Sequence, residues 1–572
     1  MSNQTTAHGK PVCDAGAMLN AYPDSMGRKL SDIVALLQKP ELTDAFRAFY
    51  ILPSVFHSDL DRGFSVIDYE LNETMASKAD LDALKYLAIA LKLDFVLNHS
   101  SVLSPPFRDI LKNGRQSKYK DFFIDWNEFW QGCGTMTEDG YIQPDEKYLK
   151  DMFFRKPGLP FLPVMLPDGT KAYYWNTFYQ EVRYDHVDAH DLVLGADMQY
   201  SAAQQLAEQI NTALKEGTPP ERIDFGAYGA YRDKILPILY AKCKYLGQID
   251  LNIKSPLVWD FYDNTLSRLA EYGATIVRLD AFAYAPKAPG SKNFLNDPET
   301  WEFLAGIAEL ADRYNLNLLP EIHSEYREKI HETLAQKGYM TYDFFLPGLL
   351  IHALEKHSNA YLLRWIDDIT TKGIKTVNML GSHDGIPLLD LRGLLPEAEI
   401  DEMIKIIVDR GGYVKDLHGN KNMYYQVNAT YYSALGEDDR KLLLARAVQL
   451  FMPGKPQVWY LDLFCGKNDH EGVKRAGAGG HKEINRTNLT KEQLENALKN
   501  KTVSDQLTLL RFRNTFPAFG FDASLTVDAP QQDKLTLRWQ KDGYTAVLQA
   551  NLADYSFTVT ATNPDGSTAF SF

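Results

Sequence analysis

The sequence predicts an α/β protein built on a (β/α)8 barrel of the TIM type, with inserted segments and a small C-terminal antiparallel β-domain. Eight short apolar runs alternate with segments of helical period through most of the chain, a pattern typical of parallel strands joined by helices. Eight parallel strands are the number that closes such a barrel. The last part of the chain instead alternates apolar and polar residues between turn signals, which predicts antiparallel strands.

The expected barrel strands are short apolar stretches spread along the chain. They lie at residues 18–25, 48–55, 91–99, 274–282, 315–323, 340–347, 376–384 and 456–464. Helices are expected between them, for example over 78–90 after the second strand and over 297–314 after the fourth. The helix after the fourth strand begins at "DPET", where Asp297 is the expected N-cap and Glu299 lies in the first turn.

Two gaps between the expected strands are too long for simple loops. The larger gap is residues 100–270 and the smaller is residues 388–437. Each is expected to hold a domain of its own, because long connections without structure are uncommon in compact domains. The barrel then comprises residues 1–99, 271–387 and 438–520, and residues 521–572 form the C-terminal β-domain.

Composition and charge narrow the classes of partner. The formal net charge of −14 argues against a nucleic-acid partner, because phosphate backbones are bound through an excess of Lys and Arg. The N-terminal residues lack the apolar core of a secretion signal, and no run approaches the length of a membrane span, so a cytoplasmic protein without a membrane partner is expected. The four scattered cysteines predict free thiols rather than disulfides or a zinc site.

Polar residues stand where several of the expected strands end. They are Asn98 and His99 on the third strand, Arg278 and Asp280 on the fourth, Glu321 and His323 on the fifth, and His383 and Asp384 on the seventh. A single carboxylate at a strand end is more often a helix cap or part of a structural ion pair. Because the carboxyl ends of barrel strands converge on the active site, the repeated pattern instead predicts a catalytic pocket.

Paired carboxylates at such a mouth suit retaining glycoside chemistry, in which one attacks the anomeric carbon and the other protonates the leaving oxygen. The nucleophile must be ionised, and Arg278 next to Asp280 is expected to lower the pKa of that carboxyl group. Glu321 follows the apolar run "NLNLLP", a context expected to keep the acid/base protonated before cleavage. Asp384 would hold sugar hydroxyls and stabilise the oxocarbenium-like transition state.

The same segments carry a family resemblance. "DFVLNH", "VRLDAFAY", "LLPEIH" and "GSHDGI", in this order, resemble the four signature regions of glycoside hydrolase family 13, the α-amylase superfamily. "YQVNATYYSALGEDD" (425–439), "PGKPQVWY" (453–460) and "INR" (484–486) resemble its sucrose phosphorylase subgroup. The resemblance implies a barrel with inserted domains B and B′, no metal or other cofactor, and transfer of an α-glucosyl group to inorganic phosphate with retention of configuration.

Site residues follow from the resemblance position by position. Asp280 corresponds to the nucleophile, Glu321 to the acid/base and Asp384 to the transition-state stabiliser. The substrate-binding residues around the donor glucose would be Asp61, Phe64, His99, Arg278, His383 and Arg486. Asp61 can accept from sugar hydroxyls, and Phe64 can stack on the apolar face of the ring. Each also has a plainer alternative, since Asp61 could cap a turn, Phe64 could be core and Arg486 could belong to a surface ion pair.

The acceptor side departs from the pattern of the subgroup. Domain B contains an extra segment at about 184–247 with helix-like sequences, which would shape the acceptor side, form a contact in a homodimer, or be a solvated helical hairpin without a catalytic role. A phosphate nucleophile needs fixed cations or donors at the mouth. The candidates are Arg155, Lys156, Tyr413, Lys415 and His418, although Lys and His on a loop are usually just solvated.

The leading hypothesis is a phosphorylase that converts sucrose and phosphate into α-D-glucose 1-phosphate and D-fructose through a β-glucosyl-enzyme. Related phosphorylases of sucrose 6′-phosphate, glucosylglycerol or glucosylglycerate share the donor half, and the sequence leaves the acceptor open. A family 13 hydrolase or transglucosidase uses the same three carboxylates with a different nucleophile. A non-catalytic sugar-binding protein is a remote alternative, because all three carboxylates are present.

Overall fold

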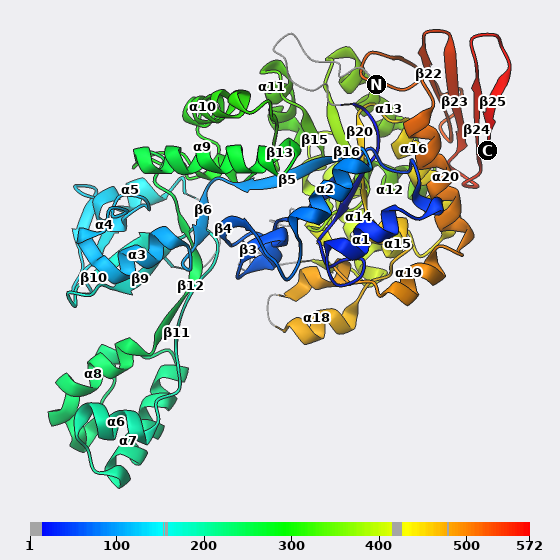
Figure 1. The fold of residues 1–572 in the computed structure, drawn as a ribbon. Helices are drawn as coiled ribbons and strands as arrows, with labels where there is room; N and C mark the ends of the chain where they lie inside the picture. The colour runs from blue at the N-terminus through cyan, green and yellow to red at the C-terminus, as the bar shows by residue number, and fades with distance from the viewer. Residues whose placement is uncertain (1–13, 153, 155–157, 415–425, 478–479) are drawn as a thin grey trace.

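A sheet of eight parallel strands forms the centre of the molecule (Figure 1). The computed structural model describes residues 14–152, 154, 158–414, 426–477 and 480–572. The strands, in their order around the sheet, are β14 (Asn317–Pro320), β13 (Ala274–Asp280), β5 (Ala90–Val96), β2 (Ala48–Ile51), β1 (Met18–Ala21), β20 (Lys455–Trp459), β16 (Thr376–Met379) and β15 (Thr341–Asp343). The end strands β14 and β15 lie against each other, so the sheet is a nearly closed barrel. The eight predicted strands and the (β/α)8 fold are confirmed.

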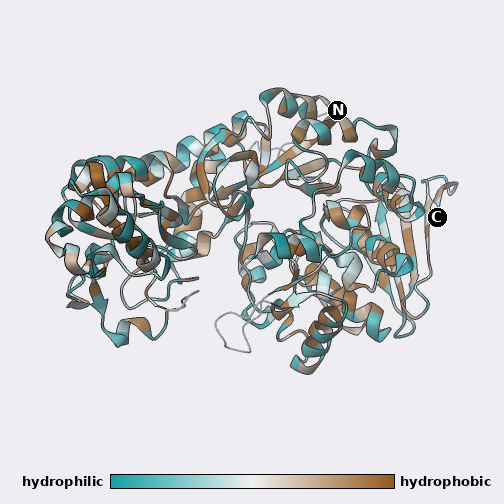
Figure 2. Cartoon of the chain, turned by 90° about the horizontal axis from the view of Figure 1, so that it is seen from below, coloured by the Kyte–Doolittle hydropathy of each residue, from teal (hydrophilic) through white to brown (hydrophobic). Residues whose placement is uncertain are grey.

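Helices surround this sheet, and most of them bury an apolar face against the core around it. They are α1 (Leu30–Leu37), α2 (Lys78–Tyr86), α9 (Pro256–Glu271), α10 (Glu299–Arg313), α11 (Ile330–Gln336), α12 (Leu346–Lys356), α13 (Ala360–Thr371), α16 (Asp439–Phe451), α17 (Tyr460–Leu463), α18 (His470–Ala476), α19 (Lys491–Ala497) and α20 (Lys501–Thr515). Hydrophobic residues follow the strands and the inner sides of helices, and hydrophilic ones the outer sides (Figure 2). None of the helices in the described residues has the length and apolarity needed to cross a membrane.

Two helix boundaries differ from those predicted. Helix α10 begins at Glu299 after Pro298 as N-cap, and no side chain caps it, so the assignment of Asp297 as N-cap is wrong. The apolar period after the second strand continues through residue 90, but α2 ends at Tyr86 and Ala90 already begins β5. At its start, α2 has a capping box between Ser77 and Asp80, which satisfies two backbone N–H groups that the helix itself cannot.

The segment between β5 and α9 folds over one side of the barrel. Its elements are β6 (His99–Ser101), α3 (Pro105–Asn113), α4 (Trp126–Phe129), β7 (Gly134–Met136), β8 (Ile142–Pro144), α5 (Glu146–Leu149), β9 (Phe161–Met165), β10 (Lys171–Trp175), β11 (Gln180–Tyr184) and β12 (Cys243–Asp250). Trp126, Trp130 and Trp175 form the centre of a small core of their own. Strand β12 pairs with β6 and aligns Asp250 with His99, which attaches this segment to the barrel mouth.

A helical arm projects from this segment on the two-stranded ribbon β11–β12 (Figure 1). It consists of α6 (Ala189–Ala196), α7 (Tyr200–Lys215) and α8 (Arg232–Ala241), which enclose a separate core that includes Leu192, Leu206 and Leu239. The helix-like sequence at 201–217 is α7. The second helix-like sequence, at 231–247, is helical only to Ala241, because Cys243–Gly247 belongs to strand β12.

Two smaller units complete the fold. After β16, the chain forms β17 (Ile386–Pro387), α14 (Glu397–Asp409), β18 (Tyr413–Val414), β19 (Gln426–Asn428) and α15 (Tyr431–Ala434). The C-terminal sheet is antiparallel, in the order β21 (Ser524–Asp528), β22 (Lys534–Lys541), β23 (Tyr544–Asn551), β24 (Phe557–Thr562) and β25 (Thr568–Ser571). A hairpin of β3 (Phe56–Ser58) and β4 (Val66–Leu71) follows β2 and carries the "DRGF" segment.

We expect the arm to unfold separately when its core is weakened. Leu206→Ala removes a fully buried side chain from this core and should cost about 2–5 kcal/mol of local stability. Amide hydrogen exchange should then show lost protection in α6–α8 and unchanged protection in the barrel strands. The control is Leu194→Ala in the same arm, where the side chain is 84% exposed and the change should be within about 0.5 kcal/mol. Equal loss of protection in the barrel would show that the arm is not an independent unit.

Candidate active site

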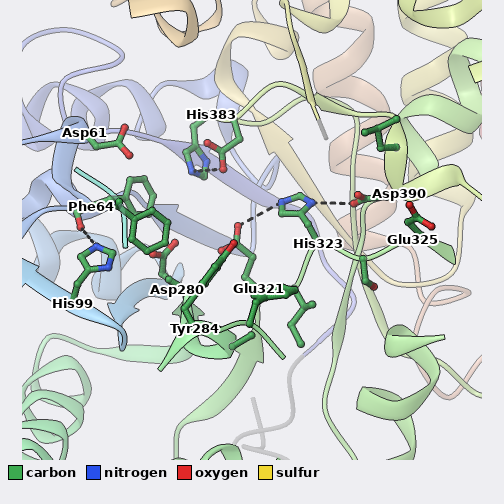
Figure 3. A pocket seen from close by; sticks show the side chains of 18 of the residues that line it. Asp61, Phe64, His99, Asp280, Tyr284, Glu321, His323, Glu325, His383 and Asp390 are labelled. Carbon is green, nitrogen blue, oxygen red and sulfur yellow. Dashed lines mark hydrogen bonds and ion pairs between the residues drawn. The ribbon is translucent and has the colours of Figure 1, made fainter. Parts of the chain in front are cut away.

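A pocket of about 510 Å³ opens at the carboxyl ends of the barrel strands (Figure 3). Its wall includes seven of the predicted site residues, namely Asp61, Phe64, His99, Asp280, Glu321, His383 and Asp384. Asp280 is the last residue of β13, Glu321 directly follows β14, and Asp384 comes five residues after β16. The strand ends therefore bring these three carboxylates, which are far apart in the sequence, to one cavity.

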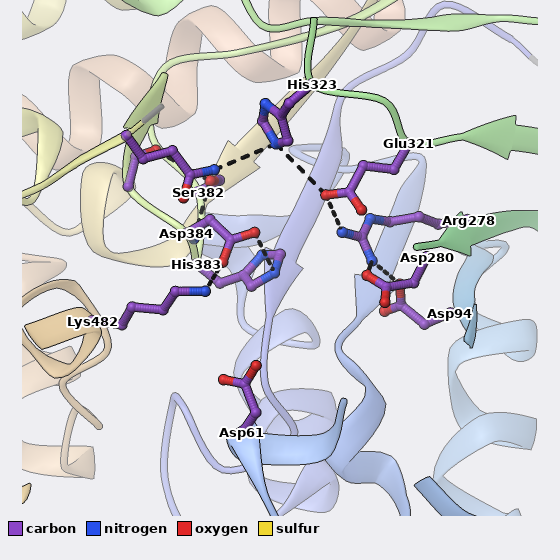
Figure 4. A network of polar contacts seen from close by, with 12 residues as sticks. Asp61, Asp94, Arg278, Asp280, Glu321, His323, Ser382, His383, Asp384 and Lys482 are labelled. Atoms are coloured by element: carbon purple, nitrogen blue, oxygen red, sulfur yellow. Dashed lines mark hydrogen bonds and ion pairs between the residues drawn. The ribbon is translucent and has the colours of Figure 1, made fainter. Parts of the chain in front are cut away.

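The guanidinium group of Arg278 connects the acidic residues beneath this cavity (Figure 4). Its Nη1 donates to Asp280 Oδ1 at 2.8 Å and to Asp94 Oδ1 at 2.6 Å, and its Nη2 lies 2.5 Å from Glu321 Oε1. Asp94 also accepts from the hydroxyl of Tyr50. Because a buried charge is tolerated only when it is paired and hydrogen-bonded, these contacts explain why a charged residue occupies an apolar strand.

The protonation of Asp280 differs from the sequence-based expectation. Burial raises the pKa of Asp280 well above its ordinary value, and although Arg278 opposes this, the carboxylates of Glu321, Asp94 and Asp384 act in the same direction as burial. Arg278 does lower the pKa of Asp280 as expected, but burial and the neighbouring carboxylates outweigh it, because one cation is shared among several carboxylates. The carboxyl group of Asp280 is therefore harder to ionise than that of an ordinary aspartate.

Glu321 does not lie in the apolar surroundings expected from the sequence. In addition to Arg278, the imidazole of His323 approaches it, with Nε2 3.7 Å from Glu321 Oε1. The other ring nitrogen, Nδ1, is 2.9 Å from Asp390 Oδ2, so His323 lies between two carboxylates (Figure 3). Polar contacts on two sides therefore surround the expected acid/base.

Lys482 and His383 lie beside Asp384 (Figure 4), and Arg486 also approaches it. Lys482 Nζ is 2.5 Å from Oδ1, Arg486 Nη2 is 3.7 Å from the same oxygen, and His383 Nε2 is 3.2 Å from Oδ2. Burial would raise the pKa of Asp384, but these three neighbours lower it well below its ordinary value. Since burial lowers the pKa of His383 itself well below its usual range, its ring is neutral, and Lys482 and Arg486 supply the compensating positive charge.

The remaining residues predicted to bind the donor glucose are Phe64, His99, Asp61 and Arg486. Phe64 stacks on the His383 ring with centroids 5.1 Å apart, and its backbone carbonyl accepts from His99 Nε2 at 3.1 Å. Burial lowers the pKa of His99 to about 4, which leaves it neutral. Arg486 is buried and its Nη1 lies 3.7 Å from Asp61 Oδ1, so it is not part of a surface ion pair. Phe64 is 6% exposed yet lines the pocket, so it is both packed and available to a sugar ring.

Of the predicted acceptor residues, Tyr413 is the one that lies among the described residues. Tyr413 is exposed, its hydroxyl lies 3.2 Å from His470 Nδ1, and it is absent from the pocket wall formed by the described residues. Arg155, Lys156, Lys415 and His418 lie outside the described residues.

Several pocket residues were not predicted from the sequence. Phe178 comes just before β11, Gln248 lies in β12, Tyr284 follows β13, and Asp390 and Lys482 lie in short 3-10 helices later in the chain. Asp94, which contacts Arg278 beneath the pocket, could have been found from the sequence, because "LKLDFV" places a charge in an apolar strand just as "TIVRLD" does. In the structure the two strands pair in register, with Asp94 opposite Arg278.

Comparison with known proteins agrees with this geometry. A scan against protein-family models gave no match. A sucrose 6(F)-phosphate phosphorylase from Ilumatobacter coccineus is 50% identical over 552 residues, which cover 95% of each chain. The chain belongs to the sucrose phosphorylase subgroup of glycoside hydrolase family 13. It is an enzyme of a phosphorylase family.

Two further relatives of the subgroup cover the whole length. A sucrose phosphorylase from Streptococcus mutans is 30% identical over 551 residues, covering 95% of this chain and 97% of the relative. The crystal structure of sucrose 6F-phosphate phosphorylase from Thermoanaerobacter thermosaccharolyticum has a TM-score of 0.79 and 30% identity, and the match covers 98% of both chains. The barrel, the inserted segments and the C-terminal sheet therefore all have counterparts in this subgroup.

The opposite pKa shifts of Asp280 and Asp384 predict opposite effects on stability. The folded-state pKa of Asp280 lies above its unfolded value of about 3.9. Ionisation of Asp280 therefore destabilises the folded protein as the pH rises from the unfolded pKa to the folded pKa. Asp280→Asn should therefore raise the free energy of unfolding at pH 7 by about 1 kcal/mol or more, and the gain should vanish near pH 4. Thermal unfolding at both pH values measures it.

Asp384→Asn is the matched comparison. In the unsubstituted protein the folded-state pKa of Asp384 is lowered, so the ionised carboxylate stabilises the fold above the unfolded pKa. That stabilisation is lost as the pH falls through the folded-state pKa. The substitution should therefore lower the melting temperature at pH 7. Stability changes of the same sign in both variants would contradict the electrostatic account.

Proposed function

We propose that the chain is a retaining phosphorylase of sucrose 6F-phosphate, forming α-D-glucose 1-phosphate and D-fructose 6-phosphate. The observation that carries this choice is the high identity, over nearly the whole chain, to the Ilumatobacter protein of that name. The sequence alone favoured sucrose as the donor, and the lower identity to a sucrose phosphorylase supports it as the second candidate. Both donors present the same α-glucosyl group to the same three carboxylates.

In the first step, the carboxylate of Asp280 attacks the anomeric carbon while Glu321 gives its proton to the glycosidic oxygen. The bond between C1 and that oxygen breaks, the fructose moiety leaves, and a β-glucosyl ester remains on Asp280. Arg278 contacts both carboxylates and holds them as close neighbours. Retaining enzymes require such closeness, and their two carboxyl groups are usually about 5–5.5 Å apart. Ester formation removes the negative charge of Asp280, which relieves the repulsion among the acidic groups.

In the second step, a phosphate oxygen attacks C1 from the face that fructose has left. The ester bond to Asp280 breaks, Asp280 regains its negative charge, and the proton of the phosphate returns to Glu321. Asp384, kept ionised by Lys482 and Arg486, faces the positive charge that develops on the sugar ring in both steps. Two inversions give net retention, so the product is the α-anomer of glucose 1-phosphate.

A panel of donors tests the assignment. Sucrose 6F-phosphate, sucrose, glucosylglycerol and glucosylglycerate are each incubated with the purified chain, with and without inorganic phosphate, and glucose 1-phosphate and glucose are both measured. We expect the highest kcat/KM for sucrose 6F-phosphate, and glucose 1-phosphate only when phosphate is present. A higher kcat/KM for another donor would reassign the acceptor, and equal glucose release without phosphate would indicate a hydrolase.

Substitution of the two reacting carboxylates separates their roles. Asp280→Asn should abolish turnover, because an amide cannot form the glycosyl ester. Glu321→Gln should slow cleavage of sugar donors by about 10²–10⁴-fold but leave donors with activated leaving groups reactive. Azide is a nucleophile that needs no base, so it should restore turnover of activated donors by Glu321→Gln. The product should be α-glucosyl azide. Near-normal turnover by Asp280→Asn would refute the mechanism.

A further inference from the structure

We propose that a cleft at the base of the helical arm binds an uncharged disaccharide. This arm cleft, which reaches from Tyr173 in β10 to Tyr240 in α8, has a volume of about 350 Å³ and shares none of its described residues with the wall of the catalytic pocket. It lies where the β11–β12 ribbon leaves the segment that contains β9 and β10 (Figure 1). Cavities of this size are at the lower end of the range for small-molecule sites. Binding there does not depend on the reaction catalysed in the barrel.

Aromatic side chains line the arm cleft from two parts of the chain. Tyr141, Phe161 and Tyr173 form one group, whose ring centroids are 4.9–5.7 Å apart. The ribbon and the arm add a second group, namely Tyr184, Tyr240 and Tyr245. All of these side chains except that of Tyr173 are half-buried, so part of each remains accessible. Aromatic rings offer a flat apolar surface on which the C–H face of a sugar ring can stack.

The charged side chains in the described wall of the arm cleft are paired with each other. Lys171 Nζ lies 2.9 Å from Glu221 Oε1, and Arg222 Nη2 lies 2.8 Å from Asp139 Oδ1. The two pairs cancel, so an ionic ligand would meet a like charge for each opposite one. Hydroxyl groups avoid this conflict, because one hydroxyl can donate to a carboxylate while another accepts from an ammonium or guanidinium group. The wall therefore favours an uncharged ligand with many hydroxyl groups.

The backbone fixes the position of these charges. Glu221 and Arg222 belong to the 3-10 turn Pro220–Arg222, where the preceding residue is also proline. Because proline fixes its own φ angle, this turn has little conformational freedom. The two partners lie outside the arm, since Lys171 begins β10 and Asp139 lies in the turn between β7 and β8. Ion pairs thus connect the arm to the segment beneath it and frame the cleft before any ligand binds.

Two sugar rings match this arrangement, one for each group of aromatic side chains. Such a ligand contacts the β9–β10 hairpin and the arm at once, and it needs α7 and α8 to be folded, because Leu214 and Tyr240 complete the wall. A ligand that binds only the folded arm opposes local unfolding, so amide exchange that requires this unfolding slows by the factor 1 + [L]/Kd. The expected slowing is about tenfold when the ligand concentration is about ten times the Kd.

Hydrogen exchange with sucrose as the probe tests this expectation. The protein carries Asp280→Asn, so that sucrose is not consumed, and sucrose is titrated in buffer without phosphate. We expect exchange to slow in a saturable way, by about tenfold at about ten times the Kd, at residues 214–222 and 240–245. Sucrose in the catalytic pocket would instead protect the mouth of the barrel. Fructose 6-phosphate at the same concentrations should leave exchange in the arm unchanged, because the charges of the cleft wall are already paired.

Substitution of the aromatic residues locates the binding. Tyr141→Ala and Tyr240→Ala remove one ring from each group, and each should weaken the binding of sucrose to the arm cleft by about 2–10-fold. Tyr200→Ala is the matched control, because Tyr200 is a tyrosine of the same arm that is 55% exposed and lies outside the cleft wall. This control should leave the protection of the arm unchanged, and all three variants should keep the protection of the barrel mouth.

Cys243 provides a second measurement that needs no substitution in the arm cleft. Its side chain is half-buried in the cleft wall, whereas Cys133 is half-buried outside that wall. Burial raises the pKa of the Cys243 thiol, so its alkylation by iodoacetamide is followed at about pH 9, where more of the reactive thiolate is present. Sucrose should slow the alkylation of Cys243 by about tenfold at about ten times the Kd and leave that of Cys133 unchanged.

Three results would overturn the inference. One is unchanged exchange in the arm together with unchanged alkylation of Cys243 when sucrose is added. Another is equal slowing of exchange with and without the Tyr141→Ala and Tyr240→Ala substitutions, because the rings would then not bind the sugar. The third is slowing by fructose 6-phosphate but not by sucrose, which would assign the cleft to an anion.

Discussion

The rest of the active site depends on one buried guanidinium. Arg278 reaches Asp94, Asp280 and Glu321 from the middle of β13, and these contacts require the register in which Arg278 lies opposite Asp94 on β5 and Leu319 on β14. A shift of one residue between the strands would turn these side chains to the other face and leave buried charges without partners. The same constraint places more acidic groups around Arg278 than one cation can neutralise, and burial together with these carboxylates raises the pKa of Asp280.

Around this guanidinium the polar residues of the pocket form two groups with different electrostatics. In one group, Lys482 and Arg486 lower the pKa of Asp384, and His99 and His383, which both contact Phe64, are neutral. The other group contains the Asp390–His323 pair and Arg392, which is paired with Glu325 and Glu397. The ribbon of the helical arm is continuous with the wall of the pocket, because β12 pairs with β6, and β6 begins at the pocket residue His99.

The sequence was sufficient for the features that local patterns encode. The eight strands and the residues at their ends follow from apolar runs interrupted by charges, as in "TIVRLD". Features that depend on distant neighbours were missed. The pKa of Asp280 depends on carboxylates in β5, directly after β14 and in the loop after β16, and Asp390 is 67 residues away from His323. The helix-like run at 231–247 ends in β12 because pairing with β11 and β6 outweighs its helical period. Pro298 displaced the expected Asp297 cap.

The central claim is that Asp280, oriented by Arg278, forms a covalent bond to the anomeric carbon. It is tested most directly by trapping the intermediate with 5-fluoro-α-D-glucosyl fluoride, whose second step is slow, and locating the label by proteolysis and mass spectrometry. The account predicts one glucosyl ester, on the peptide that contains Asp280. Added phosphate should then release the sugar from that ester. A label on Glu321, Asp384 or another residue, or active enzyme that turns over without ever carrying a label, would contradict it.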